Sequence, residues 1–156
     1  MRKINRFFHL PFSMQWLLVK AALLLSAIRV ALWLFPYRSV RPLLDRACNP
    51  SSRLSVTRPK IEEVALAISR AGTLVPGGKH CLSQALAVRI LLSRRGVPVD
   101  VRFGVRRGAD SAVMAHAWVE HNGSVLIGGS NLDRFVRLAG PEKAQIATAP
   151  RSKRLA

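Results

Sequence analysis

The longest hydrophobic pattern of the chain covers residues 14–35 and predicts a helix with Ser13 as its N-cap and Pro36 as its stop. Lys20 and Arg29 interrupt the pattern, and at about 100° per residue they fall on opposite sides of the helix. In a spanning helix these cations would each cost roughly 2.5–3.5 kcal/mol near the middle of the bilayer. We therefore expect this helix to pack on the domain or on a partner, while a membrane-surface helix and a true span stay as alternatives.

Two further helices are predicted beyond this one. Residues 37–60 contain repeated proline breaks and predict a linker with a short helical turn near Leu43. Pro59 suits a first helical position, and the apolar pattern that follows it continues to Gly72. Residues 81–95 are apolar on most sides of a helix, which is typical of a central helix covered by a sheet and by other helices.

Alternation of apolar and polar residues in the C-terminal half predicts strands. Residues 99–106 alternate and predict a half-buried strand, and residues 113–121 predict a second one. Asn122-Gly123 predicts a type I′ hairpin turn, with a third strand over residues 124–127. Helices followed by short antiparallel strands predict the α+β class.

The amino-acid balance is ordinary in its apolar content and unusual in its charge. The chain has 25 Lys and Arg residues against 8 Asp and Glu, a formal net charge of +17 in 156 residues. Such a balance favours an acidic partner, which could be nucleic acid, anionic lipid or an acidic peptide. The sequence has no aromatic-interleaved RNA motif, zinc-finger spacing or basic zipper, so we expect no nucleic acid among the partners. Peripheral contact with a membrane stays open.

The two cysteines differ in the chemistry that their positions support. Two cysteines do not build a disulfide framework, and a reducing cytoplasmic compartment fits a working thiol. Cys48 is interpreted as a small buried hydrophobe. Cys81 starts a predicted helix, where unpaired N–H groups and the positive end of the helix dipole favour thiolate over thiol. His116, on a later predicted strand, can hold the proton and pass it to a leaving group.

A third group, one that orients the His116 imidazole, is harder to place. The predicted turn sets His116 opposite Gly129, so an orienting carboxylate belongs where the sequence has glycine. Asp133 and Asn131 follow closely enough to swing back, and we take Asp133 as the candidate third catalytic residue. A Cys–His dyad, with water or a backbone carbonyl fixing the tautomer, is the alternative. The sequence has no glycine-rich phosphate loop and no spaced set of metal ligands, so we expect neither cofactor nor metal.

Three segments carry a resemblance to a known family. They are HCLSQ at the start of the predicted central helix, RRGVP at its end and AHAWVE on the second predicted strand. In this order and spacing, within residues 62–136, they resemble the transglutaminase-like cysteine peptidases that remove leader peptides in lasso-peptide biosynthesis, including microcin-processing proteins. The resemblance implies a papain/transglutaminase-like domain whose nucleophile helix packs on a small antiparallel sheet, with Cys81 as nucleophile and His116 as its base. The family's usual aspartate, twelve residues past the histidine, falls on Gly128.

The resemblance also implies a function and a set of partners. The expected reaction is proteolytic removal of the leader from a ribosomally made lasso-peptide precursor, in the cytoplasm. Family members of this length usually lack a leader-binding module, which implies a separate leader-recognition protein, with an asparagine-synthetase-like lasso cyclase taking the product. We assign residues 1–58 to an N-terminal helical arm and linker, residues 59–139 to the peptidase domain and residues 140–156 to a basic tail.

Two other classes of function stay open on the sequence. A deamidase or a cross-linking transglutaminase would use the same thiol chemistry on the same site. A non-catalytic basic protein that binds membrane or nucleic acid would keep Cys81 only as part of its core. The reactivity of the Cys81 thiol separates these classes, because only the enzymes need a reactive thiol.

Overall fold

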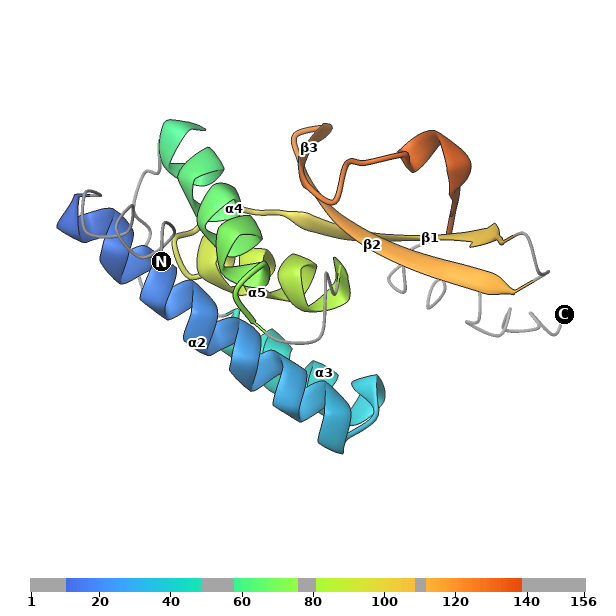
Figure 1. Ribbon diagram of the computed structural model, residues 1–156, viewed down its shortest axis with the longest axis horizontal. Coiled ribbons are helices and arrows are strands. Elements are labelled where there is room, and N and C mark those ends of the chain that lie inside the picture. Colours follow the sequence, from blue (N-terminus) through green and yellow to red (C-terminus); the bar gives the residue numbers. More distant parts are fainter. Residues whose placement is uncertain (1–10, 49–57, 76–80, 109–111, 139–156) are drawn as a thin grey trace, which may run out of the picture.

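The computed structural model describes residues 11–48, 58–75, 81–108 and 112–138. Its helices gather at one side of the molecule, and its antiparallel strands extend away from them (Figure 1). This arrangement confirms the α+β class, with the helix that starts at Cys81 packed on the sheet. The elements are α2 (Phe12–Leu34), α3 (Tyr37–Ala47), α4 (Arg58–Gly72), α5 (Cys81–Ser93), β1 (Asp100–Arg107), β2 (Val113–His121), β3 (Ser124–Ile127), the 3-10 helix η1 (Leu132–Arg134) and β4 (Val136–Arg137).

Helix α2 begins at Phe12, earlier than the hydrophobic pattern predicts. Pro11 is its N-cap residue, and the Pro11 carbonyl accepts hydrogen bonds from the N–H groups of Met14 (2.9 Å) and Gln15 (3.1 Å). Because these bonds already start the helix, Ser13 lies inside the first turn, and the prediction that Ser13 caps the helix is wrong. The proline suits this place because it lies where the first helical N–H groups lack partners in any case.

The predicted linker contains a complete helix, α3, where the sequence predicts only a short turn near Leu43. Pro42 lies inside this helix and removes one backbone donor, which is why the proline-rich pattern favours a linker. Val40 and Leu44, one helical turn apart, are both buried in the core. Tertiary burial of this face therefore stabilises a helix that the local sequence disfavours.

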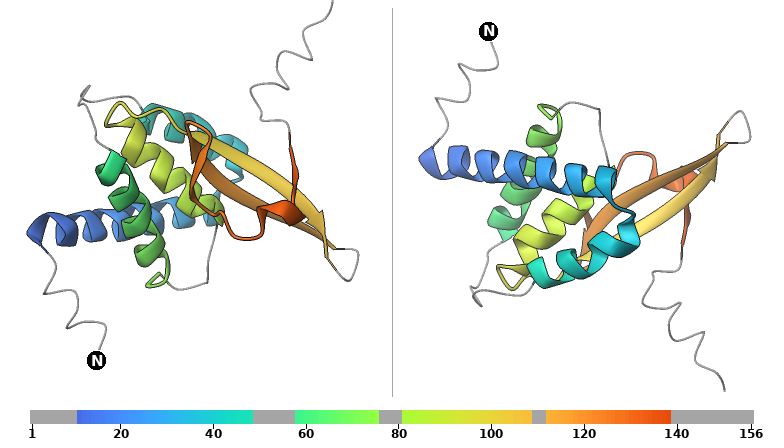
Figure 2. Two further views of the ribbon diagram at one scale, coloured as in Figure 1. Left: turned by 90° about the horizontal axis from the view of Figure 1, so that it is seen from above. Right: turned by 90° about the horizontal axis from the view of Figure 1, so that it is seen from below.

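One hydrophobic core joins the four helices to one face of the sheet. Helix α2 runs across α4 and α5 (Figure 2) and makes contact with both. The expected N-terminal arm therefore contributes buried side chains to the same core as the rest of the domain. The core includes Ala21, Leu25 and Ile28 from α2, Val64, Ile68 and Ala71 from α4, Leu86, Val88 and Leu92 from α5, and Ala117 and Val119 from β2.

The opposite side of α2 is apolar and exposed. Trp16, Leu23 and Val30 recur every seven residues along this side, and each is more than half exposed. Lys20 lies beside them, with its Nζ atom 5.1 Å from the centroid of the Trp16 ring. By length and composition alone, α2 could cross a membrane, and within the described part of the chain no other helix meets that test. The domain thus covers one side of an apolar helix and leaves the other uncovered.

The sheet has the strand order β3-β2-β1-β4, and all neighbouring strands are antiparallel. The turn between β2 and β3 has positive φ at both Asn122 (48°) and Gly123 (78°), which confirms the predicted type I′ hairpin. Successive side chains of β2 alternate between the two faces of the sheet. Val119 packs in the helical core, whereas Trp118 is buried on the other face, against Gly104 of β1.

Candidate active site

Helix α5 places Cys81 at its first position. Gly96 closes the other end of the helix, because its φ of 75° lets the Val97 N–H reach the Leu92 carbonyl at 3.0 Å. Cys81 is half-buried and packs against the core, at the end of α5 where backbone N–H groups have no helical partner. A thiol at this end can use those N–H groups to stabilise negative charge on itself or on a bound carbonyl.

Cys48 lies in a different environment, just after α3 and half-buried against the core. Burial raises the pKa of its thiol, and Asp45 adds to the rise, while Arg89 and a hydrogen bond with Ser93 oppose it. Arg89 also contacts Asp45 at 2.9 Å and so joins α5 to α3. A thiol with a raised pKa is a poor nucleophile at neutral pH, which agrees with a structural role for Cys48.

His116 lies on β2, at the border between the exposed and the buried residues of the strand. It pairs with Gly104 of β1, where a Cβ atom would lie only 3.0 Å from both Phe135 Cβ and Trp118 Cζ3. The missing side chain makes room for aromatic packing around the His116 ring. The ring centroids of Phe135 and Trp118 lie 5.0 Å and 6.2 Å from that of His116. These contacts restrict rotation of the imidazole.

A backbone carbonyl fixes the tautomer of His116. Its Nε2 atom lies 2.8 Å from the carbonyl oxygen of Gly128. Because a carbonyl oxygen can only accept a hydrogen bond, Nε2 carries the proton and donates it, and Nδ1 keeps a free lone pair. Nδ1 is therefore the atom of this ring that can take a proton from a thiol.

Gly128 stands at the position where the family resemblance predicts an aspartate, and its backbone replaces the missing carboxylate as the acceptor. A side chain does not fit at this position. The φ of Gly128 is 81°, and an added Cβ would lie 2.8 Å from the Ala117 carbonyl oxygen and 2.9 Å from Trp118 Cβ. The alternative in which a backbone carbonyl orients His116 is thus the one that the structure contains.

The predicted register, with His116 opposite Gly129, is wrong. The pairing of β2 with β3 shifts by one residue between Val119 and Glu120, where β3 contains an extra residue. Such a bulge bends its strand and increases its twist. The strand then ends, and the chain continues through Gly128, whose carbonyl meets the imidazole directly.

The two other candidates for the third group lie beyond β3. Asp133 lies in η1 and is exposed, and Asn131 precedes η1 with a positive φ of 57°. Neither side chain forms a hydrogen bond or an ion pair with any described residue. From this segment it is Phe135 that contacts the His116 ring. A catalytic role for Asp133 stays a prediction.

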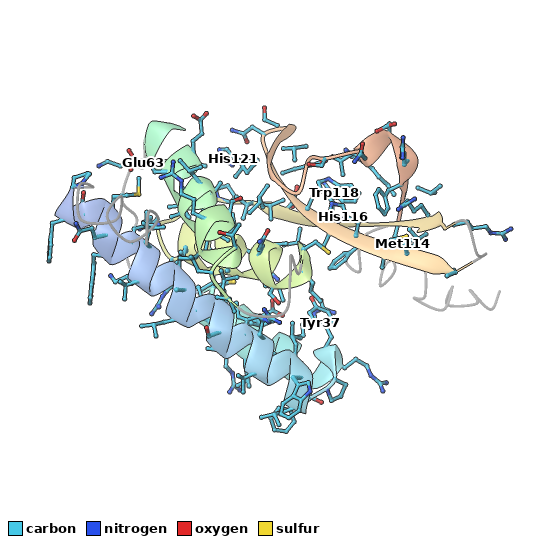
Figure 3. The ribbon with its side chains drawn as sticks, in the orientation of Figure 1. Tyr37, Glu63, Met114, His116, Trp118 and His121 are labelled. Carbon is cyan, nitrogen blue, oxygen red and sulfur yellow. The ribbon has the colours of Figure 1, made fainter. Side chains whose placement is uncertain are left out.

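Helix α5 packs on the face of β2 that carries Ala117 and Val119. His116 alternates with these residues and shares the other face with Trp118, and in the view of Figure 3 it lies above α5. Among the described residues no hydrogen bond joins the Cys81 thiol to the His116 ring. Catalytic hydrogen bonds in free enzymes are often long and tighten only when substrate binds. Cys81 and His116 stay predictions as nucleophile and base, with their elements in contact.

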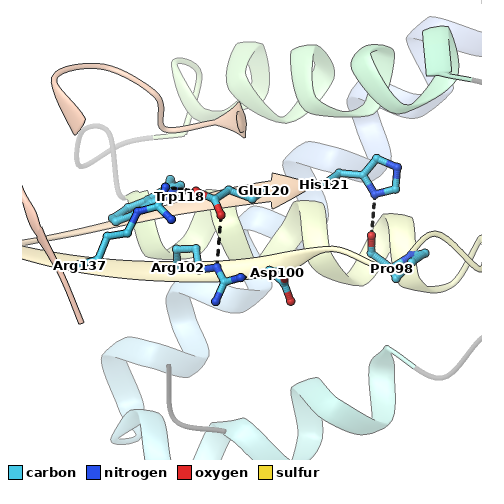
Figure 4. A network of polar contacts seen from close by, with 7 residues as sticks. All are labelled: Pro98, Asp100, Arg102, Trp118, Glu120, His121 and Arg137. Atoms are coloured by element: carbon cyan, nitrogen blue, oxygen red, sulfur yellow. Dashed lines mark hydrogen bonds and ion pairs between the residues drawn. The ribbon is translucent and has the colours of Figure 1, made fainter. Parts of the chain in front are cut away.

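A polar cluster supports the strand that carries His116 (Figure 4). The Trp118 indole N–H donates to Glu120 Oε1 at 2.9 Å, Arg102 Nε donates to Glu120 Oε2 at 3.3 Å, and Arg137 also pairs with this carboxylate. Burial would raise the pKa of Glu120, but the Trp118 hydrogen bond and the two arginines outweigh it, so the pKa is lowered. These bonds link β2 to β1 and β4, and Trp118 acts as a core residue.

Three other polar residues near the predicted site were considered from the sequence, and the structure describes two of them, each in contact with a neighbouring segment. His80, expected beside the nucleophile, lies outside the described residues. Gln84 packs against α4 so closely that a Cβ on Gly72 would lie 2.1 Å from its Nε2 atom. His121 is half-exposed, and its Nδ1 atom lies 2.7 Å from the Pro98 carbonyl oxygen.

A groove of about 880 Å³ between α4 and β3 is a feature that the sequence did not predict. Its α4 wall includes Ile61, Ala65 and Leu66, and its other wall runs along β3 to Gly128 and Gly129. The two walls are far apart in the chain, so no local pattern could reveal them. Because Gly128 belongs both to this groove and to the His116 hydrogen bond, the groove adjoins the candidate active site.

Comparison with known proteins gives one match. The family profile of the transglutaminase-like superfamily matches residues 22–140, about three quarters of the chain. No curated protein and no solved structure matches the chain. The matched span begins inside α2 and contains every other helix and strand described above, including Cys81, His116 and Gly128.

Proposed function

The chain belongs to the transglutaminase-like superfamily, and from this premise we propose that it is a cysteine peptidase that removes the leader of a lasso-peptide precursor. The superfamily supports peptidase or other acyl-transfer chemistry. The observation that carries the proposal is the hydrogen bond from His116 Nε2 to the Gly128 carbonyl. In the neutral ring this bond leaves the Nδ1 lone pair free, on a strand that packs against the helix beginning with Cys81. The finer assignment to leader removal rests on the HCLSQ, RRGVP and AHAWVE segments.

The proposed reaction proceeds through an acyl-enzyme. Nδ1 of His116 takes the Cys81 proton, and the sulfur attacks the scissile carbonyl carbon while the carbonyl oxygen becomes an oxyanion. The Cys81 backbone N–H, at the start of α5, stabilises that oxyanion. The imidazolium then protonates the leaving amine as the C–N bond breaks, which leaves a thioester on Cys81. Water attacks the thioester, gives its proton to Nδ1, and releases the acid product and the free thiol.

The proposed orienting group is the Gly128 carbonyl, so the minimal machinery is a Cys–His dyad. The carbonyl holds one tautomer and one ring orientation, which are the tasks an aspartate performs in a triad. Asp133 is then a candidate helper that would act only if its segment moved toward His116. Single-turnover rates of variants at Gly128 and Asp133 decide between these arrangements.

The proposed partners follow from the same assignment. The substrate is a lasso precursor peptide, presented by a separate leader-recognition protein, and an asparagine-synthetase-like cyclase consumes the product. All of these would act in the cytoplasm, where a thiol stays reduced. The strongly basic chain, with a formal net charge of +17, suits acidic segments on such a peptide or on the protein that presents it.

The test is a reconstituted cleavage reaction. Purified protein is incubated with a lasso precursor and its leader-recognition protein, and the products are identified by mass spectrometry. We expect one peptide bond to be cut, releasing leader and core, with no product from Cys81→Ala. Products in which a glutamine is deamidated or joined to an amine, with the peptide backbone intact, would instead assign the chain to the other acyl-transfer enzymes of the superfamily.

A further inference from the structure

The groove between α4 and β3 lies along an open edge of the sheet. In the strand order β3-β2-β1-β4, β3 has only β2 as a neighbour. Within the described residues, the backbone of Ser124–Ile127 makes no hydrogen bond to any backbone outside the sheet. An edge strand presents a row of free N–H and C=O groups on its outer side, and these can pair with another extended chain. The edge of β3 is therefore a backbone template that faces the groove.

The wall opposite this edge combines apolar and polar side chains. Ile61, Ala65 and Leu66 of α4 line it together with Glu62 and Ser69. Ile61 and Ala65 are buried, whereas Leu66 is 45% exposed although it is a large hydrophobic residue. Val125 of β3 also lines the groove and is 39% exposed. The groove has about 880 Å³ of space, within the range of roughly 300–1,000 Å³ that binding clefts usually show. A peptide strand beside β3 would therefore find hydrogen-bonding groups on one side and, on the other, Leu66 as an exposed apolar contact for one of its side chains.

The groove leads to the candidate catalytic base. Gly128 and Gly129 form the end of its β3 wall, and the Gly128 carbonyl accepts the hydrogen bond from His116 Nε2. A chain that follows β3 to this end arrives beside the residue that orients the base. β4, at the other edge of the sheet, is only two residues long and offers much less backbone for pairing. Because the groove ends at the residue that orients His116, the substrate polypeptide is the occupant for which we argue.

We propose that an extended segment of the substrate peptide binds as an added strand on the outer edge of β3, with an apolar side chain against Leu66. This inference rests on the proposed peptidase function, and it specifies how the site takes its substrate. Backbone pairing supplies affinity that depends little on sequence, and Leu66 supplies a preference for an apolar side chain at the position that meets it. The peptide would also cover the bulged strand that leads to Gly128.

The first test modifies the backbone of the substrate. Precursor peptides methylated at a single backbone nitrogen, one position at a time, are cleaved under conditions that report kcat/KM. Each methyl group removes one backbone donor and blocks close pairing. We expect kcat/KM to fall on the order of tenfold at alternate positions of the docked segment and little at the positions between them. Sensitivity without a period of two would overturn strand addition.

The second test changes the α4 wall. Leu66→Glu places a charge in the groove, and Leu43→Glu, on the exposed side of α3, is the matched control with the same change in net charge. We expect Leu66→Glu to raise KM on the order of tenfold, with a much smaller effect on kcat, and Leu43→Glu to behave as the unchanged protein. Equal KM values for the two variants would overturn the proposal and leave the peptidase assignment intact.

A binding measurement shows whether the peptide occupies the groove, independently of whether the protein is a peptidase. Cys81→Ser protein is mixed with a fluorescein-labelled precursor, and hydrogen exchange is followed at the amides of Ser124–Ile127. Protection of these amides, lost in the Cys81→Ser protein that also carries Leu66→Glu, supports the groove even if the unchanged protein cuts nothing. Bound peptide without protection at β3 overturns the groove proposal, and so does the absence of any binding.

Discussion

Helices α2 and α5 have similar compositions and very different surroundings. Both are strongly apolar and neither contains an acidic residue, over 23 residues in α2 and 13 in α5. In α5 every residue from 85 to 88 is buried, because α2, α3, α4, β1 and β2 all contact this helix. In α2 one side packs on α4 and α5, and the other presents Trp16, Leu23 and Val30 to the outside.

The difference shows that two helices of similar apolar composition can be buried to different extents. The extent depends on how many other elements pack around each helix. The placement of Lys20 and Arg29 argues against a spanning α2, and the packing of Ala21 and Leu25 in the core agrees. An exposed apolar strip of this length is nevertheless typical of a surface that meets a membrane or another protein.

The largest expected effect concerns the first residue of α5. Cys81→Ala should abolish leader removal, because no other side chain supplies the nucleophile, and the protein should keep its fold. Cys48→Ala, which removes the other half-buried cysteine, should leave the rate unchanged. Cleavage by mass spectrometry and far-ultraviolet circular dichroism measure the two properties. A normal rate for purified Cys81→Ala would show that the proposed mechanism is wrong.

The next largest effects concern His116 on β2 and the Gly128 carbonyl that orients it. His116→Ala should slow single turnover by about 10²–10⁴-fold, the range for loss of a positioned acid–base group. Gly128→Ala should also slow it, because a Cβ would meet the Ala117 carbonyl at 2.8 Å and displace the carbonyl that orients His116. We expect Asp133→Ala to stay within about threefold, because the dyad needs no carboxylate.

A different result for Asp133 would change the arrangement of the site. If Asp133→Ala slows single turnover by roughly 10–100-fold while the fold is intact, Asp133 acts on His116 and the machinery is a triad. Asn131→Ala provides the comparison, since Asn131 lies in the same exposed segment. Equal, small effects for both variants leave the Gly128 carbonyl as the orienting group.

Truncation of a buried side chain in α5 should destabilise the protein much more than truncation of an exposed side chain in α2. Leu86→Ala in α5 removes a side chain that is 1% exposed and should lower the free energy of unfolding by about 2–5 kcal/mol. Leu23→Ala in α2 removes one that is 67% exposed and should change it by no more than about 0.5 kcal/mol. Urea denaturation of both variants measures these values. A loss of more than about 2 kcal/mol for Leu23→Ala would mean that a further surface covers α2 in solution.

The exposed side of α2 is expected to contribute least, because we expect it to give no membrane attachment that resists high salt. Cells that produce the chain are fractionated, and membranes are washed with high salt, which screens electrostatic contacts. We expect the protein in the soluble fraction or released by the wash, because one side of α2 is held in the domain core. Release only by detergent would show that α2 inserts, and Leu23→Ser should then weaken attachment.

The sequence predicted the elements with strong periodic signals and missed those that depend on distant residues. The strands β2 and β3 and the Asn122-Gly123 turn follow from alternation and from a turn type that needs positive φ. Helix α3 was missed because Pro42 outweighs, locally, the burial that stabilises the helix. The register error arose because the extra residue in β3 leaves no mark on the hydrophobic pattern.

The candidate site was predictable in its side chains and not in its backbone. Cys81 and His116 stand out by residue type, spacing and family resemblance. The acceptor for His116 Nε2 has no residue type of its own, since every residue has a carbonyl, so only the path of the chain reveals that Gly128 supplies it. The groove beside β3 was missed for a related reason, because α4 and β3 meet only in the folded chain.

Orientation of His116 by a main-chain carbonyl changes how the site responds to mutation and to pH. A carboxylate can be deleted by a single codon change, whereas a carbonyl persists whatever residue occupies the position. The vulnerable property at position 128 is instead the freedom to adopt a φ of 81° in a crowded space. A carbonyl also does not titrate, so the orienting bond persists at acidities that would protonate an aspartate. The orientation of the base therefore depends on the path of the backbone at Gly128 and on no side chain at that position.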